Sequence, residues 1–171
     1  MKKPVAVLIG APGSGKSSTG RALAAMLDVT LRDTDHDVEA RAGIPIGDIF
    51  VEHGEEHFRA LEREAVAAAL AEHDGVLALG GGAVLDAETR RALTGHTVVY
   101  LEVGLTDAVK RVGLAQARPL LAMNPRARLK KLLDERLPVY EGLAVITVHT
   151  DGLTPREVAE RVAAELSGAR R

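Results

Sequence analysis

Residues 10–17, GAPGSGKS, have the types and spacing that could hold a nucleoside triphosphate. They match the pattern G-x-x-x-x-G-K-[ST] in full, after an apolar run and before a stretch with helical periodicity. Gly10, Gly13 and Gly15 allow successive backbone N–H groups to turn toward a phosphate. Lys16 would add charge at the β- and γ-phosphates, and the Ser17 hydroxyl could ligate Mg²⁺. A plain glycine turn with a solvated lysine is the alternative, and the complete pattern disfavours it.

A second stretch, LRDTDHD at residues 31–37, places three carboxylates two residues apart. Asp33, Asp35 and Asp37 would repel one another, and they would destabilise the fold if buried without a cation or hydrogen-bond donors. A solvated turn rich in aspartate is the usual interpretation of such a stretch. A neighbouring triphosphate site with Mg²⁺ would give these carboxylates another use.

Size and composition exclude several classes of protein. The chain has 171 residues, a formal net charge of -2 and no cysteine. The charge does not suggest a nucleic-acid or membrane surface, and the lack of cysteine excludes disulfides and fits a reducing compartment. No apolar stretch approaches the roughly 20 residues that cross a bilayer. We therefore expect a soluble, cytoplasmic protein that binds neither nucleic acid nor membrane.

Short β-branched runs alternate with longer helical patterns along the chain. Strands are predicted at residues 5–9, 29–32, 76–79, 97–102 and 145–149, and helices at 16–27, 35–42, 55–72, 86–93, 107–112, 126–137 and 155–167. In the long helix, Phe58, Leu61 and Ala65 recur at helical spacing, while Glu62 and its neighbours are expected mostly to face elsewhere. Thr154 before Pro155 predicts a helix start. The alternation predicts a single α/β domain over residues 1–171, a sandwich with a parallel sheet. Residues 113–125 are predicted to form a mobile loop.

The phosphate-binding loop alone does not identify the acceptor. A GTPase would need N-K-x-D after a strand, but the only asparagine of the chain is Asn124, in MNPR. A small-molecule kinase needs a second-substrate pocket, a group that orients the hydroxyl, and a segment that closes over the reaction.

The sequence resembles the shikimate kinase family over nearly its whole length. The resemblance is carried by GAPGSGKSSTG, RDTD, DIF…GEEHFRALE, LALGGGAV, ARPLL and ERLPVY, in that order. It implies a P-loop NTPase fold of the nucleoside-monophosphate-kinase type, a three-layer sandwich whose five-stranded parallel sheet has the order 2-3-1-4-5. It also implies transfer of the ATP γ-phosphoryl group to the 3-hydroxyl of shikimate with Mg²⁺, by a monomer. The substrate-binding region would span about residues 34–62 and the lid about 113–125.

The resemblance also assigns roles to residues at matching positions. It implies that Asp33 holds Mg²⁺ through water, beside Ser17, and that Asp35 takes or orients the proton of the attacking hydroxyl. Lys16 and Arg118 are the other catalytic residues that it implies. The residues assigned to the nucleotide are Gly13, Ser14, Gly15, Lys16, Ser17, Ser18, Arg111, Arg118 and Pro155. Those assigned to shikimate are Asp35, Phe50, Arg59, Gly80, Gly81, Gly82, Arg136, and also Phe58 and Glu62.

Some of these roles have plain structural alternatives. Phe50 and Phe58 would wall the substrate ring or else pack in the core. The glycine run at residues 80–82 would direct N–H groups toward the substrate and the transferred phosphoryl group, or else form a sharp turn. His36 and Asp37 are expected to be a solvated helix start.

Three other functions fit parts of the sequence. HGEEH at residues 53–57 matches the zinc-peptidase pattern H-x-x-E-H, but Gly54 is a poor residue for the interior of a helix. A gluconate-type sugar-acid kinase would share the phosphate-binding loop and the need for arginines. A catalytically silent nucleotide-binding paralogue would have no reason to keep Asp35, Arg59, Arg118 and Arg136.

Overall fold

Five parallel strands form one sheet in the order β2-β3-β1-β4-β5. The computed structural model describes residues 3–114 and 125–169, and the statements below concern those residues. The strands are β1 (Ala6–Ile9), β2 (Leu31–Asp33), β3 (Val76–Ala78), β4 (Val98–Glu102) and β5 (Ile146–His149). The order is the one that the family resemblance implied, and all five predicted strands are confirmed, with ends that differ by up to two residues.

The register brings the carboxyl ends of the strands to one edge of the sheet. Asp33 at the end of β2 pairs with Ala78 at the end of β3, and Ile9 at the end of β1 pairs with Tyr100 in β4. Ligands of open parallel sheets bind outside this edge, next to the position where the strand order reverses. Here the reversal is at β1, so the loop that follows β1 lies at that position.

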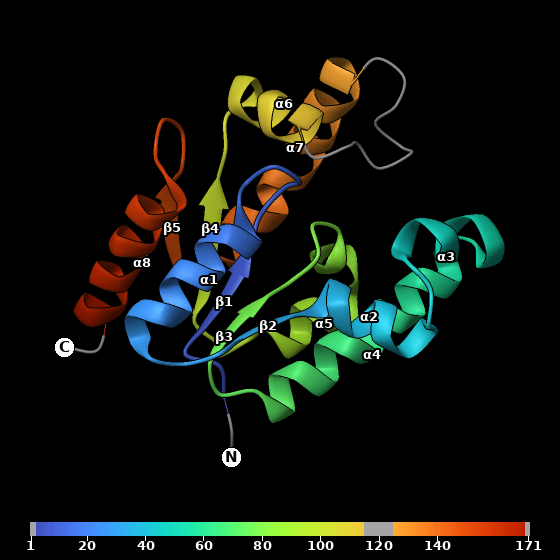
Figure 1. Ribbon diagram of the computed structural model, residues 1–171, viewed down its shortest axis with the longest axis horizontal. Coiled ribbons are helices and arrows are strands. Elements are labelled where there is room, and N and C mark those ends of the chain that lie inside the picture. Colours follow the sequence, from blue (N-terminus) through green and yellow to red (C-terminus); the bar gives the residue numbers. More distant parts are fainter. Residues whose placement is uncertain (1–2, 115–124, 170–171) are drawn as a thin grey trace.

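Helices cover both faces of the sheet (Figure 1). They are α1 (Lys16–Leu27), α2 (Thr34–Ala42), α3 (Ile46–His53), α4 (Glu55–Glu72), α5 (Ala87–Ala92), α6 (Leu105–Leu114), α7 (Pro125–Leu143) and α8 (Pro155–Ala169), with the 3-10 turn η1 (Ala83–Leu85). Side chains of a strand alternate between faces. Leu8 therefore packs with α1 and α8 in one cluster, whereas Val7 packs with α4 and α7 in another.

The largest differences from the predicted helices concern α3 and α7, whereas the other helices match within two residues at each end. Helix α3 was missed, because eight residues between Pro45 and Gly54, with Gly47 among them, carry weak local signals. Helix α7 continues past the predicted end at residue 137, through Pro138 to Leu143. Tyr140, buried in the second cluster, holds this last part of α7 against the sheet. Packing therefore overrides the helix-breaking tendency of proline.

A third, smaller cluster lies outside the sheet. Val38 of α2, Ile49 of α3, and Phe58 and Ala65 of α4 are buried together. Figure 1 shows α2, α3 and the adjoining end of α4 extending beyond the β2 edge of the sheet. Among the described residues, no helix combines the length and apolar character that crossing a membrane requires.

Candidate active site

The loop between β1 and α1 has a backbone that only glycine adopts easily. Gly13 and Gly15 have φ of 83° and 85°, and Gly15 caps the N-terminus of α1. A Cβ on Gly10 would lie 2.7 Å from Ser14 Oγ and 2.8 Å from the carbonyl oxygen of Leu101. The loop is therefore drawn tightly together, as a site for phosphate oxygens requires.

Two side chains of this loop fit an incoming triphosphate. Lys16 Nζ donates to the carbonyl oxygens of Gly10, at 2.7 Å, and Ala11, at 3.2 Å, which keeps the ammonium over the loop. Ser14 Oγ is buried and has no hydrogen-bond partner among the described residues. A buried hydroxyl without a partner is costly unless a ligand completes it. The loop thus fits the phosphate-binding role that its sequence predicted.

The two residues expected to hold Mg²⁺ meet across the sheet edge. Ser17 Oγ of α1 donates to Asp33 Oδ2 at 3.0 Å, although the two residues come from different parts of the chain. The other oxygen of Asp33 accepts from the backbone N–H of Asp35 at 2.9 Å and caps α2. Hydroxyl and carboxylate oxygens are the donors that Mg²⁺ prefers, so the pair fits that ion.

The three aspartates of residues 31–37 have separate surroundings, which reduces their repulsion. Asp37 Oδ2 accepts from Arg32 Nε at 2.7 Å, and Arg32 Nη1 also donates to Glu72 at 2.8 Å. Burial alone would lower the pKa of Arg32, but its two acidic partners raise it above the usual value. The prediction that Asp37 is merely solvated is therefore wrong, because Asp37 helps to fix α2 to α4.

Three segments that are distant in sequence meet at the glycines after β3. A Cβ on Gly80 would lie 2.6 Å from Asp35 Oδ1 and 3.0 Å from Glu62 Oε2. A Cβ on Gly82 would lie 2.6 Å from Arg59 Nη1. The absence of side chains at these positions lets an aspartate of α2, and an arginine and a glutamate of α4, approach the same backbone.

Gly81, the middle glycine of the run, lies close to α7 and to the phosphate-binding loop. A Cβ on Gly81 would lie 3.4 Å from Arg136 Nη1 and 3.2 Å from Pro12 Cδ. Asp35, Arg59 and Arg136 therefore converge on one short segment beside the loop that holds Lys16. The structure brings together these three predicted substrate-site residues, which come from α2, α4 and α7.

The direction of the Glu62 side chain differs from the prediction. Its side chain does not face away from the protein, as the helical pattern suggested, but is buried with 3% exposure. Glu62 Oε1 accepts from Nη1 of Arg59, which lies three residues earlier on α4, at 2.7 Å. This charged hydrogen bond to a buried carboxylate fixes the direction of the guanidinium.

The two phenylalanines lie together, with ring centroids 4.7 Å apart. Phe58 is 1% exposed and belongs to the cluster under α2, α3 and α4. Phe50 is only partly buried and packs against that cluster. Core packing thus describes Phe58, and Phe50 retains surface for a ligand.

Gly80 differs from the prediction for the glycine run in one respect. Its N–H donates to Thr34 Oγ1 at 3.2 Å, so this N–H group is already used inside the protein. On the other side of the run, the hydroxyl of Tyr140 donates to the carbonyl oxygen of Gly81 at 2.7 Å. Sequence reasoning gave no role to Thr34 or Tyr140, although the stretches RDTD and ERLPVY contain them.

The remaining nucleotide residues are only partly described. Arg111 of α6 donates to the carbonyl oxygens of Gly13, at 3.0 Å, and Thr150, at 3.2 Å, which joins α6 and the end of β5 to the phosphate-binding loop. Pro155 is exposed at the start of α8, where Thr154 and Glu157 exchange hydrogen bonds as a helix cap. Arg118 and most of the predicted lid lie outside the described residues.

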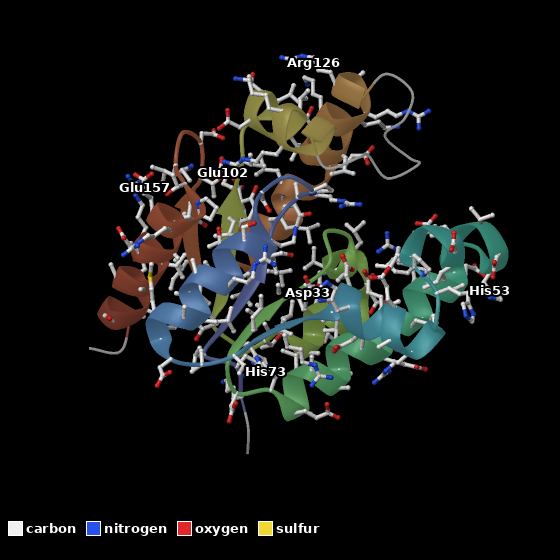
Figure 2. All side chains as sticks on the ribbon, viewed as in Figure 1. Asp33, His53, His73, Glu102, Arg126 and Glu157 are labelled. Carbon is white, nitrogen blue, oxygen red and sulfur yellow. The ribbon has the colours of Figure 1, made fainter. Side chains whose placement is uncertain are left out.

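The H-x-x-E-H pattern lies elsewhere on the molecule. His53 and His57 have ring centroids 4.8 Å apart at the junction of α3 and α4. Figure 2 shows His53 at the outer end of α3, away from Asp33. The described residues contain no group of three or more histidines or acids that could hold a metal ion.

Known proteins resemble this chain in sequence and in fold. The family model described as shikimate kinase matches residues 12–167. A shikimate kinase of Salinispora arenicola is 65% identical over 164 residues, which cover 96% of this chain and 98% of the relative. The solved structure of shikimate kinase from Acinetobacter baumannii in complex with shikimate has a TM-score of 0.93 at 32% identity, and covers 99% of this chain and 95% of that one.

A sugar-acid kinase is a more distant match. The crystal structure of a gluconokinase from Sinorhizobium meliloti has a TM-score of 0.58 at 19% identity, over 96% of this chain and 91% of that one. That likeness extends to the fold alone. The family model and the sequence relatives agree with the approach of Asp35, Arg59 and Arg136 to the glycine run. This chain therefore belongs to the shikimate kinase family.

Proposed function

We propose that this protein transfers the γ-phosphoryl group of ATP to the 3-hydroxyl of shikimate, giving shikimate 3-phosphate and ADP. The observation that carries the proposal is the approach of Asp35, Arg59 and Arg136 to the glycines at residues 80–82, beside the phosphate-binding loop. A hydroxy acid needs both a group that orients its hydroxyl and cations for its carboxylate. This segment has both within reach of Lys16.

The phosphate-binding loop would hold the triphosphate. In this proposal the N–H groups of residues 13–18, with Lys16, bind the phosphates, Arg111 and Pro155 flank adenine, and Arg118 approaches on closure. Ser17 and Asp33 would hold Mg²⁺, which neutralises charge on the phosphate oxygens when bound. The tight loop and the buried Ser14 hydroxyl support this assignment.

The acceptor would lie between α2, α4 and α7. Asp35 orients the 3-hydroxyl and accepts its proton, while Arg59 and Arg136 bind the carboxylate. A planar guanidinium matches a carboxylate with two parallel hydrogen bonds. The bond from Arg59 to buried Glu62 supports the role of Arg59, because it keeps the guanidinium oriented before the substrate arrives. Phe50 would contact the ring, with Phe58 behind it.

Positioning, more than proton abstraction, would account for the rate. An aspartate is a weak base near neutral pH, and a correctly aligned hydroxyl beside the γ-phosphate gains most from proximity. We assign the substrate-facing N–H groups to Gly81 and Gly82, because that of Gly80 donates to Thr34.

The wider organisation follows from the same proposal. Residues 1–171 would act as one kinase domain, with the substrate region at about 34–62 and a lid at about 113–125. We expect a cytoplasmic monomer whose partner is its small-molecule substrate, without nucleic acid or membrane.

A coupled assay of ADP release tests the proposal directly. The purified protein, with ATP and Mg²⁺, is offered shikimate, gluconate or nucleoside monophosphates in separate reactions. We expect ADP release with shikimate alone, and none when Mg²⁺ is chelated with EDTA. Turnover only with gluconate would establish the sugar-acid alternative, and nucleotide binding without turnover on any acceptor would establish a silent paralogue.

A further inference from the structure

The glycine run at residues 80–82 must be rigid to bind a substrate, although glycine favours conformational freedom of the backbone. Glycine loses more conformational entropy on ordering than any other residue, and here three glycines follow one another. Directed N–H groups bind well only if they are fixed in advance. Other parts of the protein must therefore hold residues 80–82 in place.

Hydrogen bonds to each of the three peptide groups provide this restraint. The N–H of Gly80 donates to Thr34 Oγ1 at 3.2 Å. The carbonyl oxygen of Gly80 accepts from the N–H of Ala83 at 3.1 Å. The carbonyl oxygen of Gly81 accepts from the Tyr140 hydroxyl at 2.7 Å. Two of the three bonds thus come from side-chain hydroxyls outside the segment.

Both hydroxyls belong to well-fixed side chains. Thr34 is 0% exposed at the start of α2, between Asp33 and Asp35. Tyr140 is 1% exposed on α7, and its ring stacks on that of Tyr100 at a centroid distance of 5.0 Å. Bonds made by buried groups persist, because breaking them would leave polar atoms without water or another partner.

Because a peptide group is planar, a hydrogen bond to its carbonyl oxygen also fixes the direction of its N–H group. The carbonyl of Gly81 and the N–H of Gly82 share one planar unit and point in opposite directions. Because the carbonyl of Gly81 points toward the Tyr140 hydroxyl, the N–H of Gly82 points away from Tyr140. Gly82 lies against the guanidinium of Arg59, and Gly81 lies near that of Arg136.

We propose that Thr34 and Tyr140 are positioning residues for shikimate, whose hydroxyls hold the glycine run so that the N–H groups of Gly81 and Gly82 face the carboxylate between Arg59 and Arg136. The inference rests on the proposed function and deepens it. Tyr140 lies one helical turn after Arg136, so α7 sets both the cation and the glycine backbone that face the same carboxylate.

The matched pair Tyr140→Phe and Tyr100→Phe tests the proposal. Both substitutions keep a buried, stacked ring and remove one hydroxyl. We expect Tyr140→Phe to raise the KM for shikimate about tenfold and to leave the KM for ATP unchanged, since a buried carbonyl loses its partner. Tyr100→Phe should leave both within about twofold.

Thr34→Val and Thr34→Ser form a second pair, which decides the matter if Tyr140→Phe does not fold. Valine has nearly the shape of threonine without the hydroxyl, whereas serine keeps the hydroxyl. We expect Thr34→Val to raise the KM for shikimate selectively, and Thr34→Ser to restore most of the affinity. Circular dichroism and thermal unfolding identify which variants are folded.

The outcomes separate this inference from the proposed function. If the wild-type protein does not phosphorylate shikimate, the proposed function fails, and the inference with it. If the wild-type protein is active but Tyr140→Phe matches Tyr100→Phe, only the inference fails. A parallel rise in the KM values for shikimate and ATP would also overturn it, because that result indicates general damage and not a positioned backbone.

Discussion

Arg59 and Arg63 lie one turn apart on α4 but have different surroundings. Arg59 donates to buried Glu62 and lies against Gly82, whereas Arg63 pairs with Asp86 and, at 3.7 Å, with Glu88. The first arginine faces the proposed substrate site, and the second joins α4 to α5. The same residue type therefore has a proposed binding role at one position and a structural role one turn later.

Replacing Arg59 with alanine should weaken shikimate binding far more than ATP binding. Charged hydrogen bonds contribute about 1.5–3 kcal/mol, so the KM for shikimate should rise about 10- to 150-fold. Steady-state kinetics with each substrate varied in turn measures the effect. Arg63→Ala is the matched control, and its KM for shikimate should stay close to that of the wild type. Equal losses for shikimate and ATP in Arg59→Ala would mean that the acceptor pocket lies elsewhere.

Asp35 and Asp37 offer a second matched comparison, two residues apart on α2. Asp35→Asn should lower kcat by about 100-fold or more, because the acceptor hydroxyl loses the group that orients it and takes its proton. ATP binding, followed by isothermal titration calorimetry, should stay intact. Asp37→Asn, which alters only the pairing with Arg32, should keep most of the turnover. Comparable kcat values for the two variants would remove Asp35 from the reaction.

At the scale of elements, caps and ion pairs fix the helices that carry the site. Asp33 caps α2, which bears Asp35, and Asp86 caps α5 by accepting from the N–H of Thr89 at 2.9 Å. Asp86 also accepts from Arg63 Nε at 3.0 Å. The bond with Arg63 and that with Thr89 hold the pKa of Asp86 below its ordinary value of 3.8, although partial burial opposes this.

The lowered pKa of Asp86 predicts how its contribution to stability depends on pH. The carboxylate stabilises the folded state above the unfolded pKa, and this stability is lost as the pH falls through the lower, folded pKa. Asp86→Ala should therefore lower the free energy of unfolding by about 1 kcal/mol near neutral pH, the usual value of an N-cap. The difference from wild type should shrink below a pH of about 4.

Urea unfolding at several pH values measures this difference. Glu88→Ala serves as the control, because Glu88 is exposed and its pair with Arg63 is long at 3.7 Å. Exposed pairs contribute little, so this variant should stay within about 0.5 kcal/mol of wild type at every pH. A loss of stability in Asp86→Ala that does not change with pH would indicate that lost packing, and not the charge, is responsible.

At the scale of the whole molecule, the site exists because a parallel sheet brings distant segments to one edge. Asp35, Arg59 and Gly80 are separated by more than 20 residues from one to the next along the chain. They meet because β2 and β3 are neighbours in register and α4 crosses between them. Gly80 lies at the centre of this meeting, and a side chain there would disturb all three segments.

Gly80→Ala should therefore reduce stability and activity together. Its Cβ would lie 2.6 Å from Asp35 Oδ1, and overpacking of this kind costs about 1–3 kcal/mol. Thermal unfolding and the ADP-release assay report the two losses. Gly142→Ala is the control. Apart from the adjacent helix backbone, nothing lies within 4 Å of the added Cβ, and the position is helical, so stability should rise by about 0.5–1 kcal/mol. Wild-type activity in Gly80→Ala would show that the close approach is unnecessary.

Much of the fold and part of the site could be predicted from the sequence. The bounds of α1 and α4 match the predictions at 16–27 and 55–72. The phosphate-binding loop was recognised because its glycines, lysine and serine are consecutive. Such features depend on neighbours in the chain, and their spacing is written directly in the sequence. The strand order and the roles of Asp35, Arg59 and Arg136 came from the family resemblance, and were not worked out from spacing.

Other features could be known only from the tertiary structure. Glu62 looked like a surface residue of α4 but is buried, because Arg59 and Gly80 lie over it. Thr34 and Tyr140 carry no local signal for their bonds to the glycine run, since their partners are 46 and 59 residues away. The sequence by itself determined most of the elements and the glycine-rich pattern to which we assign the phosphates. Only tertiary packing decided which side chains face each other across the acceptor site, because those contacts depend on the relative placement of whole strands and helices.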